Sequence, residues 1–591
     1  MTPVSERRIP TLQRQAVDRV REWSYAHPRA KMLLRESWGI SREAARLAHL
    51  PAPFEPVELD DLRRLRDTAV AVPTPPAGRL LVLSTRGWST HAVIETTLAH
   101  AARTRGWEPI FATCGGRLPI CDVAPVHAAP PMPCHSCAGY ATDAIQAAGF
   151  DPILVRDLVD MRATAARTRA EVRQLRSVAE CEAYSVDGLA IGLFVRISVA
   201  WFLSRGTLLD DDETLDAYRS FLVSGAILRA AFEELLERTR PDRIFILNGA
   251  FFPERILAEM ATSRSIPVVR YEKGFLTDTV VACHWRPGAS ILDFGQKAWE
   301  EALTTPLTSE ESHELDAYLE ERVRGGRTLD NFWANRIADN DRIRKHLGLR
   351  DDRPLVPVFL NVVWDSSIQG RDVAFPSMGE WLVNVIRWAD TRPDVDVVVR
   401  LHPAEIGLVN HVSRERMADH IDTNFESLPD NVHVVGADSS ISSYSLMEMA
   451  TLGLVYTSTV GMEMAARGIP VVCAGAGHYV HHGFTVDPQS QEEYWQAVER
   501  LLESPPPVDE RARSQDLARR YAHLFFFRYH QYLDVVHEAG RSRPRVTIRS
   551  ASDLAPGRHA VVDRLMECIL QGDGPAITPI PQRSSVENPI E

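Results

Sequence analysis

The chain has 591 residues, 45% of them hydrophobic and 25% charged, which are the proportions of a globular protein with two or more domains. Its formal net charge of −13 argues against nucleic-acid binding, which needs a basic surface. No apolar run approaches the roughly 20 residues that span a bilayer, and the N-terminus lacks the apolar core of a signal peptide; we therefore expect a cytoplasmic protein without a membrane span, and peripheral membrane contact stays open.

The first half of the chain predicts an α/β domain that carries two additions. Residues 1–75 are charged and helix-patterned. From residue 76 a strand–helix–strand pattern begins a Rossmann-like domain, which we extend to residue 290. A cysteine loop at 114–137 and a strongly helical insertion at 151–238 interrupt this domain.

The second half repeats the α/β pattern. A helical sequence pattern over 291–350 predicts a linker, and the strand–helix pattern over 351–540 predicts a second Rossmann-like domain. Residues 541–591 form a C-terminal extension that we expect to be partly disordered, because its end is rich in Pro, Ser and Asn. Two such domains enclose a cleft, which suits a nucleotide on one wall and an acceptor on the other.

Four cysteines of the loop suggest a structural metal site. Cys114, Cys121, Cys134 and Cys137 follow the spacing C-x6-C-x12-C-x2-C. A C-x2-C pair is a common chelating unit, and two further thiolates complete a tetrahedral shell for zinc or hold an iron–sulfur cluster. The alternative is a set of reduced thiols in a Gly/Pro-rich loop.

The strand DVVVR ends in a candidate phosphate site. It delivers Arg400 and His402 to the carboxyl edge of the second sheet, where ligands of open α/β sheets bind. Pro403 stops the strand and fixes the backbone after the histidine. A histidine there can hydrogen-bond a phosphate, and the alternative is a capping residue in a surface turn.

A second strand end on this sheet carries hydroxyl groups and a glycine. Thr457, Ser458, Thr459 and Gly461 precede or open a helix, where free backbone N–H groups and the helix dipole favour an anion. Ordinary helix capping is the alternative. Glu463 lies in the first turn of that helix, and either binds a ribose diol or complements the dipole.

Glu272, in YEKGF, is the candidate general base of the first domain. It lies at a strand end that faces the predicted phosphate site, although a Glu272–Lys273 surface turn is the alternative. His284 and Glu254 are further candidates near the same edge. Residues at other strand ends or in the loops after them are predicted to line the cleft or the acceptor site: Asn248, Asn361, Asp365 and His478.

The motifs RLHPAE, YTSTVGMEMAARGIPVVCAG and HYVHHGFTVDP resemble the bacterial capsule polysaccharide biosynthesis glycosyltransferases, which include Kdo and sialyl transferases. The resemblance implies a GT-B architecture, with Glu272 as base, His402-Pro403 as the HP motif and Ser458-Thr459 as the donor-phosphate pair. The acidic motif reads Glu-Lys-Gly here, whereas the family usually has two acids.

The sequence therefore predicts a nucleotide-sugar-dependent glycosyltransferase. We expect inversion, no metal in catalysis, a donor of the CMP or UDP type, and a glycan, lipid-linked or small-molecule acceptor. One alternative is a nucleotide-sugar epimerase on the same fold. The other is a non-catalytic scaffold that carries a metal on the cysteine loop.

Overall fold

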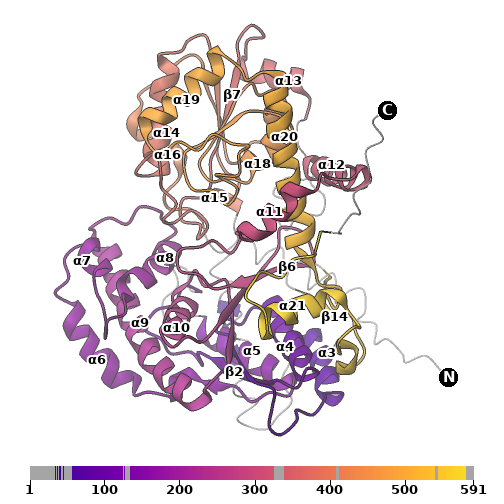
Figure 1. Ribbon diagram of the computed structural model, residues 1–591. Helices are drawn as coiled ribbons and strands as arrows, with labels where there is room; N and C mark the ends of the chain where they lie inside the picture. Colours follow the sequence, from indigo (N-terminus) through magenta and orange to yellow (C-terminus); the bar gives the residue numbers. More distant parts are fainter. Residues whose placement is uncertain are drawn as a thin grey trace, which may run out of the picture.

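The protein consists of two α/β domains stacked end to end (Figure 1). A computed structural model describes residues 56–123, 126, 133–324, 338–407, 412–539 and 543–580, with a few single positions between 33 and 44. Most of the predicted helical segment 1–75 and the last residues of the C-terminal extension lie outside this described part.

The N-terminal sheet has seven strands in the order β12-β6-β5-β4-β1-β2-β3. Its strands are β1 (Arg79–Leu83), β2 (Glu108–Thr113), β3 (Ile153–Leu154), β4 (Arg243–Leu247), β5 (Val268–Lys273), β6 (Thr279–His284) and β12 (Gln531–Tyr532). β1 to β5 pair in parallel, and β6 and β12 are antiparallel additions. Leu80 and Val82 of β1 enter one core and Leu81 and Leu83 the other, so the sheet is covered on both faces.

Helices cover both faces of this sheet. They are α3 (Val57–Asp67), α4 (Ser89–Arg103), α5 (Cys134–Ala147), α6 (Met161–Val172), α7 (Val178–Glu182), α8 (Ile191–Leu203), α9 (Asp212–Thr239), α10 (Phe252–Thr262) and α21 (Ala560–Leu570), with short 3₁₀ turns at Val155–Asp157 and Ala551–Leu554. The long helix α9 begins with Asp211 as its N-cap, whose side chain accepts from Thr214 N. The predicted insertion thus forms the layer α6 to α9.

The C-terminal sheet is fully parallel, in the order β11-β10-β7-β8-β9. Its strands are β7 (Leu355–Phe359), β8 (Asp396–Arg400), β9 (Val432–Val435), β10 (Gly453–Val455) and β11 (Val471–Cys473). β7 and β8 are buried along their whole length, as expected of strands with helices on both faces. The helices are α14 (Met378–Asp390), α15 (Ala404–Gly407), α16 (Met417–Asn424), α17 (Ser443–Glu448), α18 (Val460–Ala466), α19 (Gln491–Glu503) and α20 (Val508–His523).

Two connections link the domains. α11 (Gln296–Thr304), α12 (Ser309–Arg324) and α13 (Asn340–Leu347) carry the chain upward, and α20 carries it back (Figure 1). After α20 a π-helical turn, Leu524–Tyr529, leads into β12 of the N-terminal sheet.

The predicted C-terminal domain therefore ends before residue 540, because the apolar run Leu524–Tyr529 is buried and directs the chain into the other sheet. The extension beyond it is not merely a tail. The hairpin of β13 (Val536–Glu538) and β14 (Pro544–Val546) is followed by α21, which packs on the N-terminal domain.

The predicted fold class is confirmed: the chain is α/β, with two Rossmann-like domains that face a cleft. In the described part of the chain, no helix combines the length and the apolar character that a membrane crossing requires.

Candidate active site

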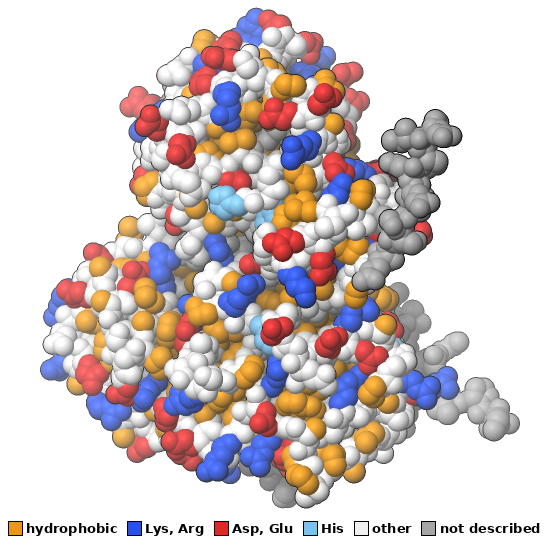
Figure 2. All heavy atoms as spheres, viewed as in Figure 1, with side chains coloured by type: hydrophobic (Ala, Val, Ile, Leu, Met, Phe, Trp, Pro, Cys, Tyr) orange, Lys and Arg blue, Asp and Glu red, His pale blue; other side chains and the backbone are white. Residues whose placement is uncertain are grey.

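The domains face each other across a cleft of about 960 Å³. The lobes meet at a narrow waist, where histidine side chains and basic Lys or Arg side chains reach the surface (Figure 2). Strand ends and loops from both domains form its walls, as the carboxyl-edge rule predicts. The predicted site residues that line it are Glu272, Asn361, Asp365, Arg400, His402, Pro403, Thr457, Ser458, Thr459 and His478. The predicted residues that lie outside this lining are Asn248, Gly461 and Glu463.

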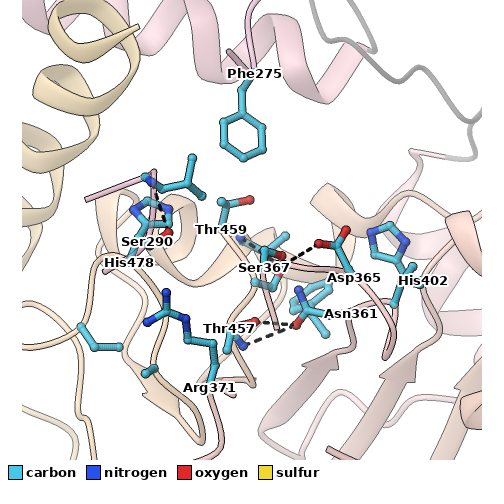
Figure 3. A pocket seen from close by; sticks show the side chains of 18 of the residues that line it. Phe275, Ser290, Asn361, Asp365, Ser367, Arg371, His402, Thr457, Thr459 and His478 are labelled. Carbon is cyan, nitrogen blue, oxygen red and sulfur yellow. Dashed lines mark hydrogen bonds between the residues drawn. The ribbon is translucent and has the colours of Figure 1, made fainter. Parts of the chain in front are cut away.

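His402 enters the cleft from the end of β8 (Figure 3). The backbone amide of Ala404 donates to His402 Nδ1 over 3.1 Å, so the neutral ring carries its proton on Nε2. Burial, and then the charge of Arg400, lowers the pKa of His402 to about 4. At neutral pH the His402 ring is therefore an N–H donor without a positive charge.

Arg400 uses its guanidinium mostly for hydrogen bonds within the protein. Its side chain is buried, and the guanidinium donates to Ser443 Oγ over 3.2 Å and to the carbonyl oxygens of Gly436 and Ser439. These bonds hold the loop after β9 against β8. Arg400 thus shapes the cleft wall and lowers the pKa of His402.

The turn Thr457–Thr459 lies between β10 and α18, beside Asn361 (Figure 3). Asn361 Oδ1 accepts from both the amide and the hydroxyl of Thr457, each at 3.4 Å. Ser458 Oγ accepts from Val460 N at 3.4 Å. Hydroxyl groups therefore stand at the cleft wall in a fixed turn, which suits an oxyanion.

Gly461 makes room for a neighbouring tyrosine. Tyr479 donates its hydroxyl proton to Ser458 O over 2.6 Å, and a Cβ at residue 461 would lie 2.3 Å from Tyr479 Oη. Gly461 thus leaves room for the Tyr479 side chain that holds the turn, and Gly461 does not itself line the cleft.

We expect Gly461→Ala to lower the free energy of unfolding by about 1–3 kcal/mol, because Tyr479 must be displaced from a packed position. Urea denaturation measures this change. Gly139→Ala is the matched control, since a Cβ there meets nothing within 4 Å and the site is inside α5. The control should gain about 0.5–1 kcal/mol. A Gly461→Ala variant as stable as wild type would contradict the account.

Glu463 is buried behind the cleft wall, where it pairs with Arg322 at 3.0 Å. Arg322 in turn donates to Tyr444 Oη and Tyr318 Oη, and both Arg322 and Tyr444 line the cleft. Glu463 therefore holds Arg322 in place, a role that its position in the first turn of a helix did not indicate.

Glu272 lies on the N-terminal wall and is held by two donors. Asn248 Nδ2 donates to Glu272 Oε2 and Lys273 N to Oε1, both over 2.8 Å. Burial raises the pKa of Glu272, and these hydrogen bonds oppose the shift. Lys273 pairs with Glu538 at 2.7 Å, so the motif is not a solvated surface turn. Asn248 positions the carboxylate instead of lining the cleft.

His478 and Asp365 have clear partners in the wall. His478 lies with its Nδ1 3.0 Å from Tyr521 Oη and stacks on Phe525 at 4.4 Å. Burial lowers the pKa of His478 to about 3, so its ring is neutral. Asp365 Oδ1 accepts from Ser367 N over 2.8 Å and stabilises its own turn.

Arg371 is a cleft residue that the sequence analysis missed. Ala476 N donates to Arg371 O over 2.9 Å, which fixes its loop beside the end of β11. The guanidinium points toward the cleft near Thr457 and His478 (Figure 3), with no hydrogen-bond partner in the described part of the chain. Burial, and then Arg270, lowers its pKa, so an anion there would be stabilised. In the sequence, the only signal for Arg371 as a cleft residue is its position in a polar loop that follows a strand.

The predicted metal site is not supported. Across the described residues, no group of three or more His, Cys, Asp or Glu side chains is placed to hold a metal. Cys137 Sγ accepts from Gly87 N at 3.1 Å, Cys114 Sγ accepts from Gly116 N at 3.3 Å, and Cys121 donates to Asp122 at 3.5 Å. Burial, and then the nearby Cys137, raises the pKa of Cys114 to about 12.

Residues 303–507 match the model of the family described as capsule polysaccharide biosynthesis protein. This match confirms the predicted resemblance over the part of the chain that contains His402-Pro403 and the Thr457–Gly461 turn. No curated protein matches the chain.

The chain is also similar to several solved structures. The β-Kdo 2,7-transferase of Thermosulfurimonas dismutans KpsC shows 17% identity, covers 49% of this chain and 79% of its own, and has a TM-score of 0.29. The β-Kdo 2,4-transferase of the same protein shows 13% identity, with 53% and 87% covered and a TM-score of 0.31. S. aureus MnaA with UDP shows 10% identity, with 76% and 94% covered and a TM-score of 0.25. Likenesses at these scores decide neither fold nor function.

Proposed function

We propose that this chain is a glycosyltransferase that moves a sugar from a nucleotide-sugar donor, of the CMP or UDP type, to a hydroxyl group of a glycan, lipid-linked or small-molecule acceptor. One observation carries the proposal: a carboxylate, Glu272, faces the same cleft as His402 and the Thr457–Thr459 turn of the opposite domain. A base and an oxyanion site on opposite walls suit transfer to a hydroxyl group. The family match over 303–507 supports this assignment.

The proposed reaction is an inverting displacement that needs no metal. Glu272 takes the proton of the acceptor hydroxyl as its oxygen attacks the anomeric carbon and the bond to the nucleotide phosphate breaks. His402 Nε2–H, the hydroxyl groups of the 457–459 turn and Arg371 stabilise the departing phosphate, which is the larger catalytic contribution expected for such a site. The donor lies on the C-terminal wall and the acceptor on the N-terminal wall.

The two alternatives have less support. An epimerase shares the architecture, but in the described part of the cleft Glu272 and the Thr457–Thr459 turn lie on opposite walls, an arrangement that suits transfer between two substrates. The metal-bearing scaffold lacks a metal cluster within the described residues.

A thermal-shift screen against CMP, UDP, GDP and dTDP tests the donor site. A nucleotide at 100 times its Kd stabilises the native state by about 2.7 kcal/mol. We expect His402→Ala to weaken the bound nucleotide about 10–100-fold, because it removes one hydrogen bond to a charged group. The Ser458→Ala/Thr459→Val double variant should act in the same direction.

His433→Ala is the matched control, because His433 lies on β9 of the same sheet and outside the cleft lining. Its nucleotide affinity should equal that of the wild type. Unchanged affinity in both His402→Ala and the double variant would contradict the donor site.

A further inference from the structure

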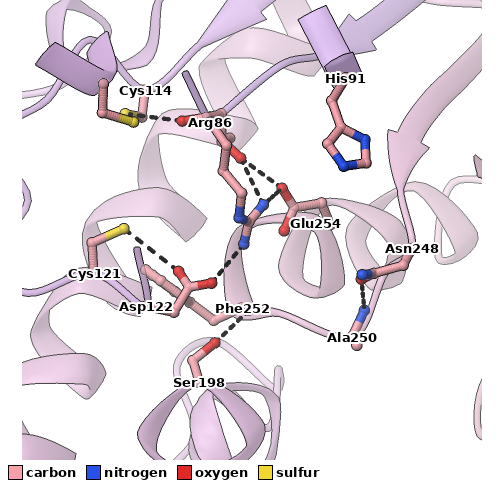
Figure 4. A network of polar contacts seen from close by, with 12 residues as sticks. Arg86, His91, Cys114, Cys121, Asp122, Ser198, Asn248, Ala250, Phe252 and Glu254 are labelled. Carbon is pink, nitrogen blue, oxygen red and sulfur yellow. Dashed lines mark hydrogen bonds and ion pairs between the residues drawn. The ribbon is translucent and has the colours of Figure 1, made fainter. Parts of the chain in front are cut away.

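A row of buried polar side chains runs inward from Glu272. His91 and Glu95 lie one turn apart on α4, and both contact Tyr271 of β5. His91 Nε2 lies 3.9 Å from Glu272 Oε1, His91 Nδ1 lies 3.2 Å from Tyr271 Oη, and Tyr271 Oη donates to Glu95 Oε1 over 2.8 Å. In Figure 4, His91 and Asn248 lie on the same side of the Arg86–Glu254 pair. The row connects the cleft to a carboxyl group in the core.

The hydrogen bonds determine which nitrogen of His91 carries the proton. An ionised Glu95 only accepts, so Tyr271 donates its single hydroxyl proton to it and must accept from His91 Nδ1–H. His91 Nε2 is then an acceptor that faces Glu272. If Glu95 is protonated, Tyr271 can donate to His91 Nδ1 instead, and His91 presents Nε2–H to Glu272.

We propose that Glu272 is the outer end of a buried proton relay that runs through His91 and Tyr271 to Glu95. The relay rests on the proposed function, in which Glu272 is the base. His91 and Tyr271 are positioning residues in this scheme, since neither lines the cleft. The gap of 3.9 Å is about 1 Å longer than a hydrogen bond, a difference that a rotation of the Glu272 side chain at the cleft wall removes when the acceptor binds.

Each proton moves by one link. Glu272 takes the proton of the acceptor hydroxyl and passes it to His91 Nε2. His91 Nδ1 releases its proton to Tyr271 Oη, whose own proton passes to the Glu95 carboxylate. Glu272 is again ionised, His91 is again neutral with its proton on the other nitrogen, Tyr271 is again a hydroxyl, and Glu95 has become a carboxylic acid. No charge is left on the ring. After the products leave, the proton returns by the reverse steps to Glu272, which releases it to water in the open cleft, so no co-reactant is needed.

The surroundings fit a relay that keeps His91 neutral. Burial, then Lys273 and Arg86, lowers the pKa of His91 to about 3. Burial raises the pKa of Glu95 to about 7, and the charge of Glu254 adds to this shift. Hydrogen bonds from Ser84 and Tyr271 and the charge of Arg86 lower the pKa and so oppose the shift. Glu95 can therefore exchange a proton near neutral pH, whereas His91 does not acquire charge there.

NMR of the full chain labelled with ¹⁵N-histidine tests the row without any substrate. The His91 signals are assigned by their loss in His91→Gln. We expect His91 to carry its proton on Nδ1 above about pH 8 and to shift toward the Nε2–H tautomer as the pH falls through about 7, where Glu95 gains its proton. Glu95→Gln and Tyr271→Phe should abolish this pH response.

Tyr218→Phe is the matched control, because Tyr218 is also fully buried in the N-terminal domain and donates one hydrogen bond, to Gly192 O. It should leave the His91 response unchanged. A single His91 tautomer across about pH 6–9 would overturn the relay, as would conversion of His91 to imidazolium near its ordinary pKa of about 6.5.

Nucleotide release from a panel of CMP-, UDP-, GDP- and dTDP-sugars, with simple glycosides as acceptors, supplies the kinetic test. Tyr271→Phe should lower kcat about tenfold with KM unchanged, which is part of the 10²–10⁴-fold that a general base contributes. Tyr218→Phe should keep the wild-type kcat. Equal kcat in Tyr271→Phe and wild type would overturn the relay. Absence of release by the wild type would contradict the proposed function, while the NMR experiment would still decide the relay geometry.

Discussion

Glu272→Gln is expected to lower kcat by about 10²–10⁴-fold, because the amide keeps the shape of the side chain but cannot accept the proton of the acceptor hydroxyl. Nucleotide affinity should hardly change, since Glu272 lies on the N-terminal wall, opposite the proposed donor site. Single-turnover rates and nucleotide Kd values measure the two quantities separately. Glu259→Gln is the control, because this residue of α10 forms a helical ion pair with Arg255 instead.

The pH dependence of the wild type should carry the signature of the same carboxyl group. Burial raises the pKa of Glu272, so the base is lost as the pH falls through that raised value, earlier than for an ordinary carboxyl group. Glu272→Gln should lack this acid limb. Near-wild-type activity in Glu272→Gln would place the base elsewhere.

The two other candidates for the base are poorly placed to replace it. His284 Nε2 bonds to Cys568 O at 3.1 Å, and Glu254 is locked to Arg86. Neither is among the described residues that line the cleft.

The strand ends were the predictable part of the site. Short apolar runs mark β5, β8 and β10 in the sequence. β8 and β10 end at one edge of the parallel C-terminal sheet, and β5 ends at an edge of the N-terminal sheet that faces the same cleft. For this reason the sequence alone predicts that Glu272, His402 and the 457–459 turn face one cleft. The helical insertion was equally clear, because α8 and α9 are long and apolar along their buried faces.

The unpredicted features depend on contacts between distant segments. Arg371 lies in a loop without periodicity, and only pairing with the end of β11 places it in the cleft. β12 has two residues, too few for a strand pattern, and joins the other domain through a buried π-helical turn. Glu463 fits the pattern of a helix start, yet its partner Arg322 is 141 positions away along the chain (463 − 322).

Arg86→Met is expected to lower the free energy of unfolding by about 3–5 kcal/mol, because it leaves two buried carboxyl groups without their counter-charge. Arg86 lies in the loop after β1, pairs with Asp122 at 2.7 Å and also pairs with Glu254 (Figure 4). All three side chains are at most 3% exposed. Urea denaturation measures the loss, and Arg264→Met, which breaks a partly exposed pair with Glu233, should cost about 1 kcal/mol or less.

The pH dependence separates lost charge pairing from lost packing. Burial already raises the pKa of Glu254, and Arg86 opposes that shift, so removing Arg86 raises this pKa further. A carboxyl group whose folded pKa exceeds its unfolded value stabilises the fold below the unfolded pKa and loses this contribution as the pH rises through the folded pKa. The deficit of Arg86→Met should therefore be larger at pH 8 than at pH 5.

Adding Asp122→Asn and Glu254→Gln to Arg86→Met should recover part of the stability at pH 8, since neutral amides no longer need the guanidinium. A deficit that is equal at both pH values, and that the amides do not reduce, would show that Arg86 acts through packing against Trp88 and Phe251 and not through charge.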